Sequence, residues 1–250
     1  MKSIRHFLGA LLCLFACLTG YASAAEVRVL SSNAMREVVL EAASNFEKAS
    51  GHKVSTEFVG SVDILKRLRS GEKSADVILL QESSIDDLIR EGLVVTGSRK
   101  NIARSLIGVA VRAGSPRPDI SSGDALKRTL LATKSIVVSS GPSGAYMLSL
   151  FEKMGIPRDH YRQLGVGVQT GQLVARGEAE LCFQQVSEIL PVKGIDYLGS
   201  LPRDVEHVTV FAGGLHSASP SPQASQALLA YLTSPVAAPV LKAKGMDPIK

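Results

Sequence analysis

The stretch SSGPSGAYMLSLFEKMG, residues 139–155, joins a run of small residues to an amphipathic helix pattern. Large side chains recur along it at helical spacing, at Tyr146, Met147, Leu150, Phe151 and Met154. Residues 140–144 are serine, glycine and proline, and they fall where this helix should begin. Serine is a good N-cap, and glycine lets the backbone approach another group closely. The stretch therefore predicts a helix start that is either an ordinary cap or a cradle for a ligand.

The same arrangement recurs along the chain, where β-like runs alternate with helical patterns. Ser31-Ser32-Asn33 follows a predicted strand at 26–30, and Gly60-Ser61 follows one at 53–59. Residues 165–171, GVGVQTG, lead into a further helical run. Other strands are expected at 75–80, 107–111, 136–138, 181–184 and 208–211, with C-terminal helices at 223–233 and 236–244. This alternation indicates an α/β fold with a largely parallel sheet.

Four small-residue segments at helix starts suggest a site for a small anion. The first turn of a helix has N–H groups without intrahelical partners and carries a partial positive charge. Several such ends meeting at the carboxyl edge of a sheet would bind an anion without Lys or Arg. The candidates from these segments are Ser31, Ser32, Gly60, Ser61, Ser143, Gly144, Val168 and Gln169. The alternative is that each segment is simply a good N-cap.

The N-terminal residues have the pattern of a secretory signal peptide. A basic start precedes an apolar run at 7–18, and Ala22-Ser23-Ala24 fits a cleavage site after Ala24. Lipidation at Cys17 is the alternative. Removal of residues 1–24 takes away two of the 28 Lys and Arg and none of the 23 Asp and Glu, which leaves a net charge of +3. This mild charge does not indicate nucleic-acid binding, and Cys182 is left without a disulfide partner.

Other chemistries lack their sequence patterns. GVGVQTG does not have the spacing of a dinucleotide fingerprint, there is no phosphate loop, and Ser143 does not stand in a nucleophile elbow. The histidines expected in the mature chain show no metal spacing and are each expected at the surface: His52, His160, His207 and His216. No cofactor and no metal are expected. The sequence yields no set of nucleophile, base and orienting group, so a secreted hydrolase is the less favoured alternative.

Four segments together resemble a known family. They are SSNAM, then FVGS with LKRLRSGEKSADVIL, then SGPSGAY with FEKMGI, and finally YLTSPVAAPVLKAKGM. In this order the chain resembles the periplasmic molybdate-binding proteins of bacterial ABC importers, which are type II periplasmic solute-binding proteins. The resemblance implies two α/β lobes with a ligand cleft between them. Lobe 1 would comprise residues 25–109 and 206–250, and lobe 2 residues 110–205.

The resemblance also implies ligand contacts by position. They fall at Ser31 or Ser32, Ser61, Ser143, Gly167 or Val168, and Gln185. Family members often have Ala in place of Ser143 and commonly have Tyr in place of Gln185. The expected function is an exported, monomeric receptor that captures a molybdate- or tungstate-like oxyanion and presents it to an ABC-type permease. Because Ser143 and Gln185 mix donors with acceptors, a small organic di- or tricarboxylate is the alternative ligand.

Overall fold

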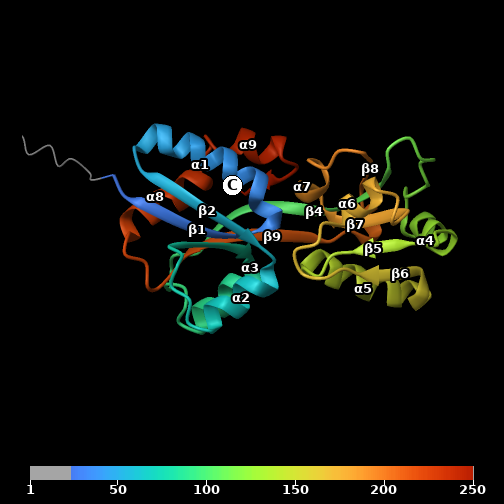
Figure 1. Ribbon diagram of the computed structural model, residues 1–250, viewed down its shortest axis with the longest axis horizontal. Helices are drawn as coiled ribbons and strands as arrows, with labels where there is room; N and C mark the ends of the chain where they lie inside the picture. The colour runs from blue at the N-terminus through green and yellow to red at the C-terminus, as the bar shows by residue number, and fades with distance from the viewer. Residues whose placement is uncertain (1–23, 250) are drawn as a thin grey trace, which may run out of the picture.

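The computed structural model describes residues 24–249, in which strands and helices alternate along the chain (Figure 1). The predicted signal peptide, with Cys13 and Cys17, lies outside the described residues except for Ala24. The strands are β1 (Glu26–Ser32), β2 (Lys53–Val59), β3 (Val77–Gln81), β4 (Lys100–Arg112), β5 (Ile136–Val138), β6 (Tyr161–Gln163), β7 (Leu181–Gln185), β8 (Ile195–Ser200), β9 (Val208–Leu215) and β10 (Asp247–Pro248).

The helices are α1 (Arg36–Ser50), α2 (Ser61–Arg69), α3 (Glu82–Arg90), α4 (Gly123–Ala132), α5 (Pro142–Met154), α6 (Thr170–Ala175), α7 (Val186–Ile189), α8 (Pro222–Leu232) and α9 (Ala238–Ala243). Short 3-10 turns are η1 (Asn33–Met35), η2 (Arg158–His160) and η3 (Arg203–Val205). The predicted α/β class is confirmed.

The sheet is mixed rather than largely parallel. Its strands run in the order β2-β1-β3-β9-β4-β7-β5-β6, with β8 and β10 also paired to β4. The outer pairs β1–β2, β1–β3, β5–β6 and β5–β7 are parallel, whereas every pair made by β4 or β9 is antiparallel. The expectation of a largely parallel sheet therefore holds only toward the two ends. The alternation of strands and helices along the chain does not show that β9 inserts between β3 and β4 and runs antiparallel to both.

Strand β4 belongs to both halves of the molecule. Its residues 100–106 pair with β9, and its residues 107–112 pair with β7 and β8. The hydrophobic clusters divide in the same way, with β1, β3, α1 and α8 in one half and β5, β7, α4 and α5 in the other. Figure 1 shows the two halves side by side with β4 and β9 between them. That they are separate lobes with the predicted limits remains a proposal.

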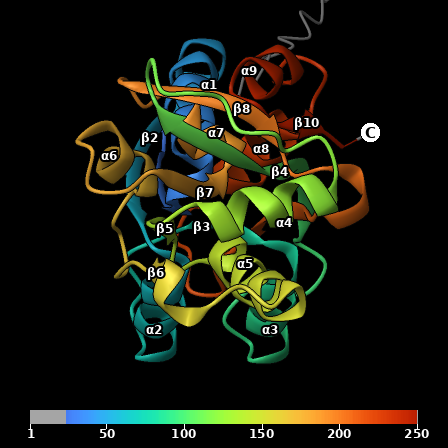
Figure 2. The ribbon, with the colours of Figure 1, turned by 90° about the vertical axis from the view of Figure 1, so that its right-hand side faces the viewer.

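Each half is a layered arrangement because its central strands are apolar on both faces. In β3, Val77 and Leu79 face the cluster under α1 and α8, while Ile78 and Leu80 face the cluster under α2 and α3. Successive side chains of a strand point to opposite faces, so an unbroken apolar run requires cover on both sides. In the second half, α4 and α5 pack on one face and α6 and α7 on the other (Figure 2).

The histidine expectation needs one correction. His216 is fully enclosed, at 3% exposed, and its Nδ1 accepts a hydrogen bond of 3.2 Å from the Ala218 backbone. It is buried because it directly follows β9, where its backbone pairs with Val94 across the strand end. His52, His160 and His207 are half-buried.

Two findings concern residues 24–249 alone. Among them, no helix is long and apolar enough to cross a membrane. Within the same residues, His, Cys, Asp and Glu form no cluster that could hold a metal ion.

Candidate functional site

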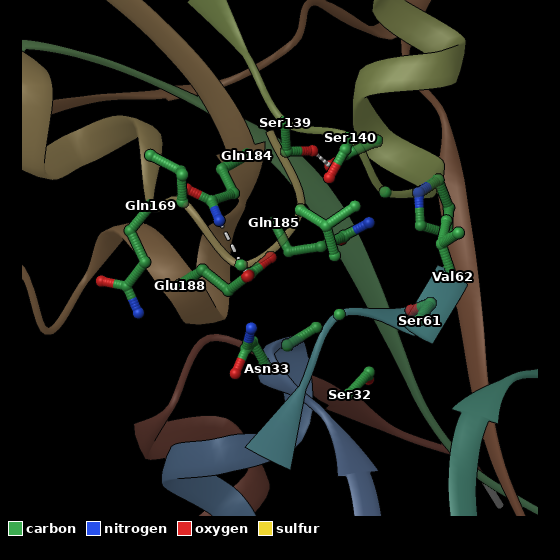
Figure 3. Close-up of a pocket in the computed structure, with 18 of the residues that line it drawn as sticks. Ser32, Asn33, Ser61, Val62, Ser139, Ser140, Gln169, Gln184, Gln185 and Glu188 are labelled. Carbon is green, nitrogen blue, oxygen red and sulfur yellow. Dashed lines mark hydrogen bonds between the residues drawn. The ribbon is translucent and has the colours of Figure 1, made fainter. Parts of the chain in front are cut away.

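A polar pocket lies between the two halves, where the carboxyl ends of β1, β2, β5 and β7 meet (Figure 3). The first half contributes residues 32–34, residues 60–62 and Phe211. The second half contributes residues 139–143, residues 166–169, Gln184, Gln185 and Glu188. In Figure 3, Ser32, Asn33 and Ser61 face the glutamines and Glu188 across the open centre.

The structure brings together most of the residues that the sequence singles out. Those that line the pocket are Ser32, Gly60, Ser61, Ser143, Val168, Gln169 and Gln185. Ser31 and Gly144 do not line it. That the lining residues contact a ligand remains a prediction.

Ser31 and Gly144 have structural roles instead. Ser31 is fully buried and its Oγ donates a hydrogen bond of 3.1 Å to the Ser32 carbonyl. Because adjacent strand residues point to opposite faces, only Ser32 of the pair can face the pocket. At Gly144, an added Cβ would lie 1.7 Å from the carbonyl oxygen of Ser139. This position is glycine because the first turn of α5 packs directly on the end of β5.

The start of α5 has no side-chain cap, which is true of every described α-helix except α4. Neither α5, capped by Gly141, nor α2, capped by Gly60, has a side chain that accepts a hydrogen bond from its first turn. Helix α4 provides the contrast, because the Ser122 hydroxyl accepts from the Ala125 N–H at 3.1 Å. First-turn N–H groups of α2 and α5 are therefore left without a side-chain partner at the pocket wall, where the helix dipole also favours negative charge.

Two buried polar atoms of the pocket have no partner. They are the Ser32 Oγ and the Gln185 Oε1, on side chains that are each only 2% exposed. The other end of the Gln185 amide has a partner, because its Nε2 donates to the Thr209 Oγ1 at 2.9 Å. The Thr209 hydroxyl can also donate, so the amide can turn over and present an N–H to the pocket without losing this bond.

Glu188 places a carboxyl group in the same pocket. Its Oε1 accepts a hydrogen bond of 2.8 Å from the Gln184 Nε2. The Gln184 Oε1 in turn accepts from the Thr170 backbone N–H at 3.0 Å and from its hydroxyl at 2.7 Å. A backbone N–H can only donate, so this contact fixes the orientation of the Gln184 amide. Burial raises the pKa of Glu188 to about 7, although the Gln184 hydrogen bond opposes the shift.

The pocket contains no cationic side chain. Among the residues that line it, Glu188 alone is ionisable. Ser143 is not activated as a nucleophile, because its Oγ pairs at 3.0 Å with the Ser139 hydroxyl and no histidine lines the pocket. The wall can therefore offer N–H and hydroxyl donors to an anion, with one carboxyl among them.

The sequence patterns did not point to Glu188, nor to Phe211 of β9, as residues of the pocket. Glu188 lies three positions after Gln185, on α7, which has only four residues. A helix this short has no apolar periodicity to reveal it. The signal available was the turn itself, since residues 183–188, FQQVSE, pass from a buried strand to polar residues as the other pocket segments do.

Two α/β halves that share a central strand, with a polar pocket between them, define the architecture of type II periplasmic binding proteins. The chain matches the model of the bacterial extracellular solute-binding protein family over residues 27–247. It therefore belongs to that family, as its resemblance to molybdate-binding proteins indicated.

Two relatives and one solved structure show the range of the similarity. The chain is 37% identical to an aconitate isomerase of a Pseudomonas species, over 97% of this chain and 95% of the relative. It is 30% identical to a molybdate-binding protein of Azotobacter vinelandii, over 90% of both chains. A solved periplasmic molybdate-binding protein of A. vinelandii superimposes with a TM-score of 0.73 at 18% identity, covering 90% of this chain and all of the other.

Proposed function

We propose that this protein captures a small organic di- or tricarboxylate in the pocket between its halves. It acts as an exported, monomeric binding protein without a chemical step of its own, and it presents the ligand to an ABC-type membrane permease. The predicted signal peptide and the family support export, and the pocket supports an anionic ligand. The contacts proposed are the lining residues Ser32, Gly60, Ser61, Ser143, Val168, Gln169 and Gln185, together with Glu188.

The observation that carries the choice of ligand is the carboxyl of Glu188 in this wall. A polycarboxylate holds its last proton more tightly than a single carboxyl does, because neighbouring carboxylates repel further ionisation. Such a ligand can share a proton with Glu188. The mixed character of Gln185 points the same way, since its amide has both a donor and an acceptor end. The relative that acts on aconitate adds support.

A thermal-shift screen tests this proposal against its main rival. The anions are molybdate, tungstate, sulfate and phosphate on one side, and succinate, citrate and both aconitate isomers on the other. A ligand at 100 times its Kd stabilises the fold by about 2.7 kcal/mol, so one or more carboxylates should raise the melting temperature clearly. A rise in melting temperature with molybdate or tungstate, but with none of the carboxylates, would favour an oxyanion receptor. No shift with any anion would remove the receptor proposal.

Gln185→Tyr gives a second measurement of the ligand class. Gln185 is buried against Thr209, so a phenol ring at this position would extend into the pocket. We expect it to weaken binding of a polycarboxylate by about 1–3 kcal/mol, because it takes ligand space and removes a buried hydrogen bond. For an oxyanion, affinity would hold or improve. Calorimetric titration of both proteins with citrate and with molybdate distinguishes the two.

Isomerisation of an unsaturated tricarboxylate is a second candidate function. The observation that favours it is the carboxyl group of Glu188 in the pocket wall. A carboxyl with a pKa near 7 can take and return a proton at neutral pH. Proton NMR of cis- and trans-aconitate incubated with the protein tests this candidate. Interconversion by the wild type, lost in Glu188→Gln with binding retained, would establish an enzyme. If the protein binds aconitate but the ratio of the two isomers does not change, the receptor function is supported and the isomerase is not.

A further inference from the structure

Glu188 presents a charge problem in a pocket proposed to hold an anion. It is the single ionisable side chain of the pocket wall, and it accepts its hydrogen bond from the Gln184 amide, which is uncharged. The orientation of Gln184 is fixed by Thr170. Glu188 therefore faces the ligand space from a rigid support, without a cation beside it.

The charged groups on elements that pack against α7 do not neutralise Glu188. Beside η1, the Arg36 guanidinium donates to the Asn33 Oδ1 at 3.2 Å and lies 4.5 Å from the centre of the Phe58 ring. Glu37 lines a separate hollow together with Lys244. On β4, Arg104 lines another hollow outside the pocket, and Lys100 and Arg112 stand at the two ends of the strand. Strand β7 carries no charged residue, and neither does β9.

A fully ionised ligand and an ionised Glu188 would therefore repel each other at close range, with no counter-charge between them. A single proton placed between the two oxygens replaces that repulsion with a charge-assisted hydrogen bond. The proton can reside on Glu188 or on a ligand carboxyl, and the binding equilibrium is the same for both. Burial, which holds the pKa of Glu188 near 7, makes the proton available at neutral pH.

We propose that Glu188 and the bound anion share one proton, so that the pocket takes up a proton when it captures a fully ionised ligand. This inference rests on the proposed anion-binding function. It makes Glu188 a determinant of specificity, because the site prefers anions able to share a proton. It also makes capture tighter in acidic surroundings and release easier in alkaline ones.

Calorimetric titration with trans-aconitate and with molybdate at pH 7 to 9 tests the proposal. We expect wild-type affinity for a bound probe to fall toward tenfold per pH unit above about pH 7. Titrations at one pH in two buffers of different ionisation enthalpy should show uptake of up to one proton. Glu188→Gln, which stays neutral, should bind with a flat pH profile and no proton uptake.

Glu180→Gln is the matched control, because Glu180 is an exposed carboxylate just before β7. It should keep the wild-type pH profile. A wild type that binds a probe with a flat profile and no proton uptake would overturn the shared proton while leaving the proposed function intact. A wild type that binds neither these probes nor any other anion would overturn both. Because proton uptake is measured on the wild type, the test stands even if Glu188→Gln fails to fold.

Discussion

Two of the buried polar clusters within residues 24–249 differ in how completely the hydrogen bonds of their central groups are satisfied. The first surrounds Asp76, which is fully buried at the start of β3. Its carboxylate accepts from the Arg28 backbone at 2.8 Å, from the Arg28 guanidinium at 2.9 and 3.1 Å, and from the Ser219 hydroxyl at 2.7 Å. Every donor here comes from the protein itself.

The second cluster is the pocket, where buried groups are left open. Ser32 and Gln185 each have a polar atom without a hydrogen-bond partner, and no cationic side chain lines the pocket beside Glu188. Within residues 24–249 four buried side-chain atoms lack a partner, and two of them, the Ser32 Oγ and the Gln185 Oε1, belong to this pocket. A buried polar atom without a partner costs free energy, which a bound ligand would recover here. The comparison separates a cluster that holds the fold together from one that is completed by a ligand.

Of the substitutions considered, removal of the Asp76 carboxylate should have the largest effect, which is a loss of folding stability. Asp76→Ala leaves the buried Arg28 N–H and the Ser219 hydroxyl without their acceptor. We expect a loss of about 3 kcal/mol in the free energy of unfolding, at the low end for a buried ion pair because Arg28 keeps contact with solvent. Urea denaturation at pH 7 measures this loss. Asp87→Ala, an exposed carboxylate paired with Arg90, should change stability by no more than about 0.5 kcal/mol.

The same variant has a pH signature. Burial alone raises the pKa of Asp76, but the hydrogen bonds from Arg28 outweigh it and hold the pKa below its ordinary value. A carboxylate with a lowered pKa stabilises the fold above its unfolded pKa and loses this contribution as the pH falls through the folded value. The stability gap between wild type and Asp76→Ala should therefore narrow below about pH 3.8. A constant gap from pH 7 to pH 3 would contradict the ionic origin of the effect.

Gly60→Ala should act on binding across the cleft. A Cβ at this position would lie 2.5 Å from the Val166 Cγ1 of the opposite half. Val166 is 41% exposed and can shift in part, so we expect a cost of about 1 kcal/mol, at the low end for added volume, and a fall of about fivefold in affinity for the bound anion. Gly165→Ala is the control, since a Cβ there meets nothing within 4 Å. Equal affinities of the two variants would show that the halves need not approach each other at Gly60.

Ser32→Ala should separate stability from binding. The Ser32 hydroxyl has no partner, so its removal should leave the ligand-free protein as stable as before or slightly more stable. Affinity should fall by about 1 kcal/mol, roughly fivefold, if the hydroxyl bonds the ligand. Ser225→Ala should lower the stability and leave the affinity unchanged, because the Ser225 Oγ donates to the Ser221 carbonyl at 2.8 Å, far from the pocket. Melting curves and calorimetry on both variants check this pair.

Gln169→Ala should have the smallest effect. Gln169 caps α6 without a side-chain hydrogen bond to the helix, and its amide points away from the centre of the pocket in Figure 3. We expect affinity to change by less than about threefold, within the range of ordinary surface substitutions. A tenfold loss in calorimetric titration would show that Gln169 contacts the ligand through its side-chain amide rather than through its backbone.

The sequence predicted the regular elements and the pocket segments where local patterns were strong. Apolar runs located β1, β2, β5 and β7. Small residues after β1, β2 and β5, and at 165–171 before α6, marked four of the segments that meet at the pocket. The α/β class followed from the alternation of strands and helices. The antiparallel centre did not, because it depends on which strands pair over long distances, and no local pattern encodes the neighbours of β9.

Individual side chains at the site were harder to predict than segments. Ser31 and Ser32 are indistinguishable as neighbouring serines until the pleat of β1 decides which one faces the pocket. Gly144 has the composition of a ligand loop, yet its lack of a Cβ serves the close approach to Ser139. Glu188 carries an ordinary surface residue type, and only the surrounding protein changes its pKa.

The position of β9 has a consequence for how the chain acquires its structure. Residues 208–215 lie between β3 and β4, so the first half of the sheet stays divided until nearly the whole chain has been synthesised. Until then β3 and β4 each expose an edge to other strands, which is the condition under which chains associate wrongly. Pairing across such long sequence separations is also slow. Truncation shortly before residue 208 should therefore yield an aggregating chain rather than a smaller folded one.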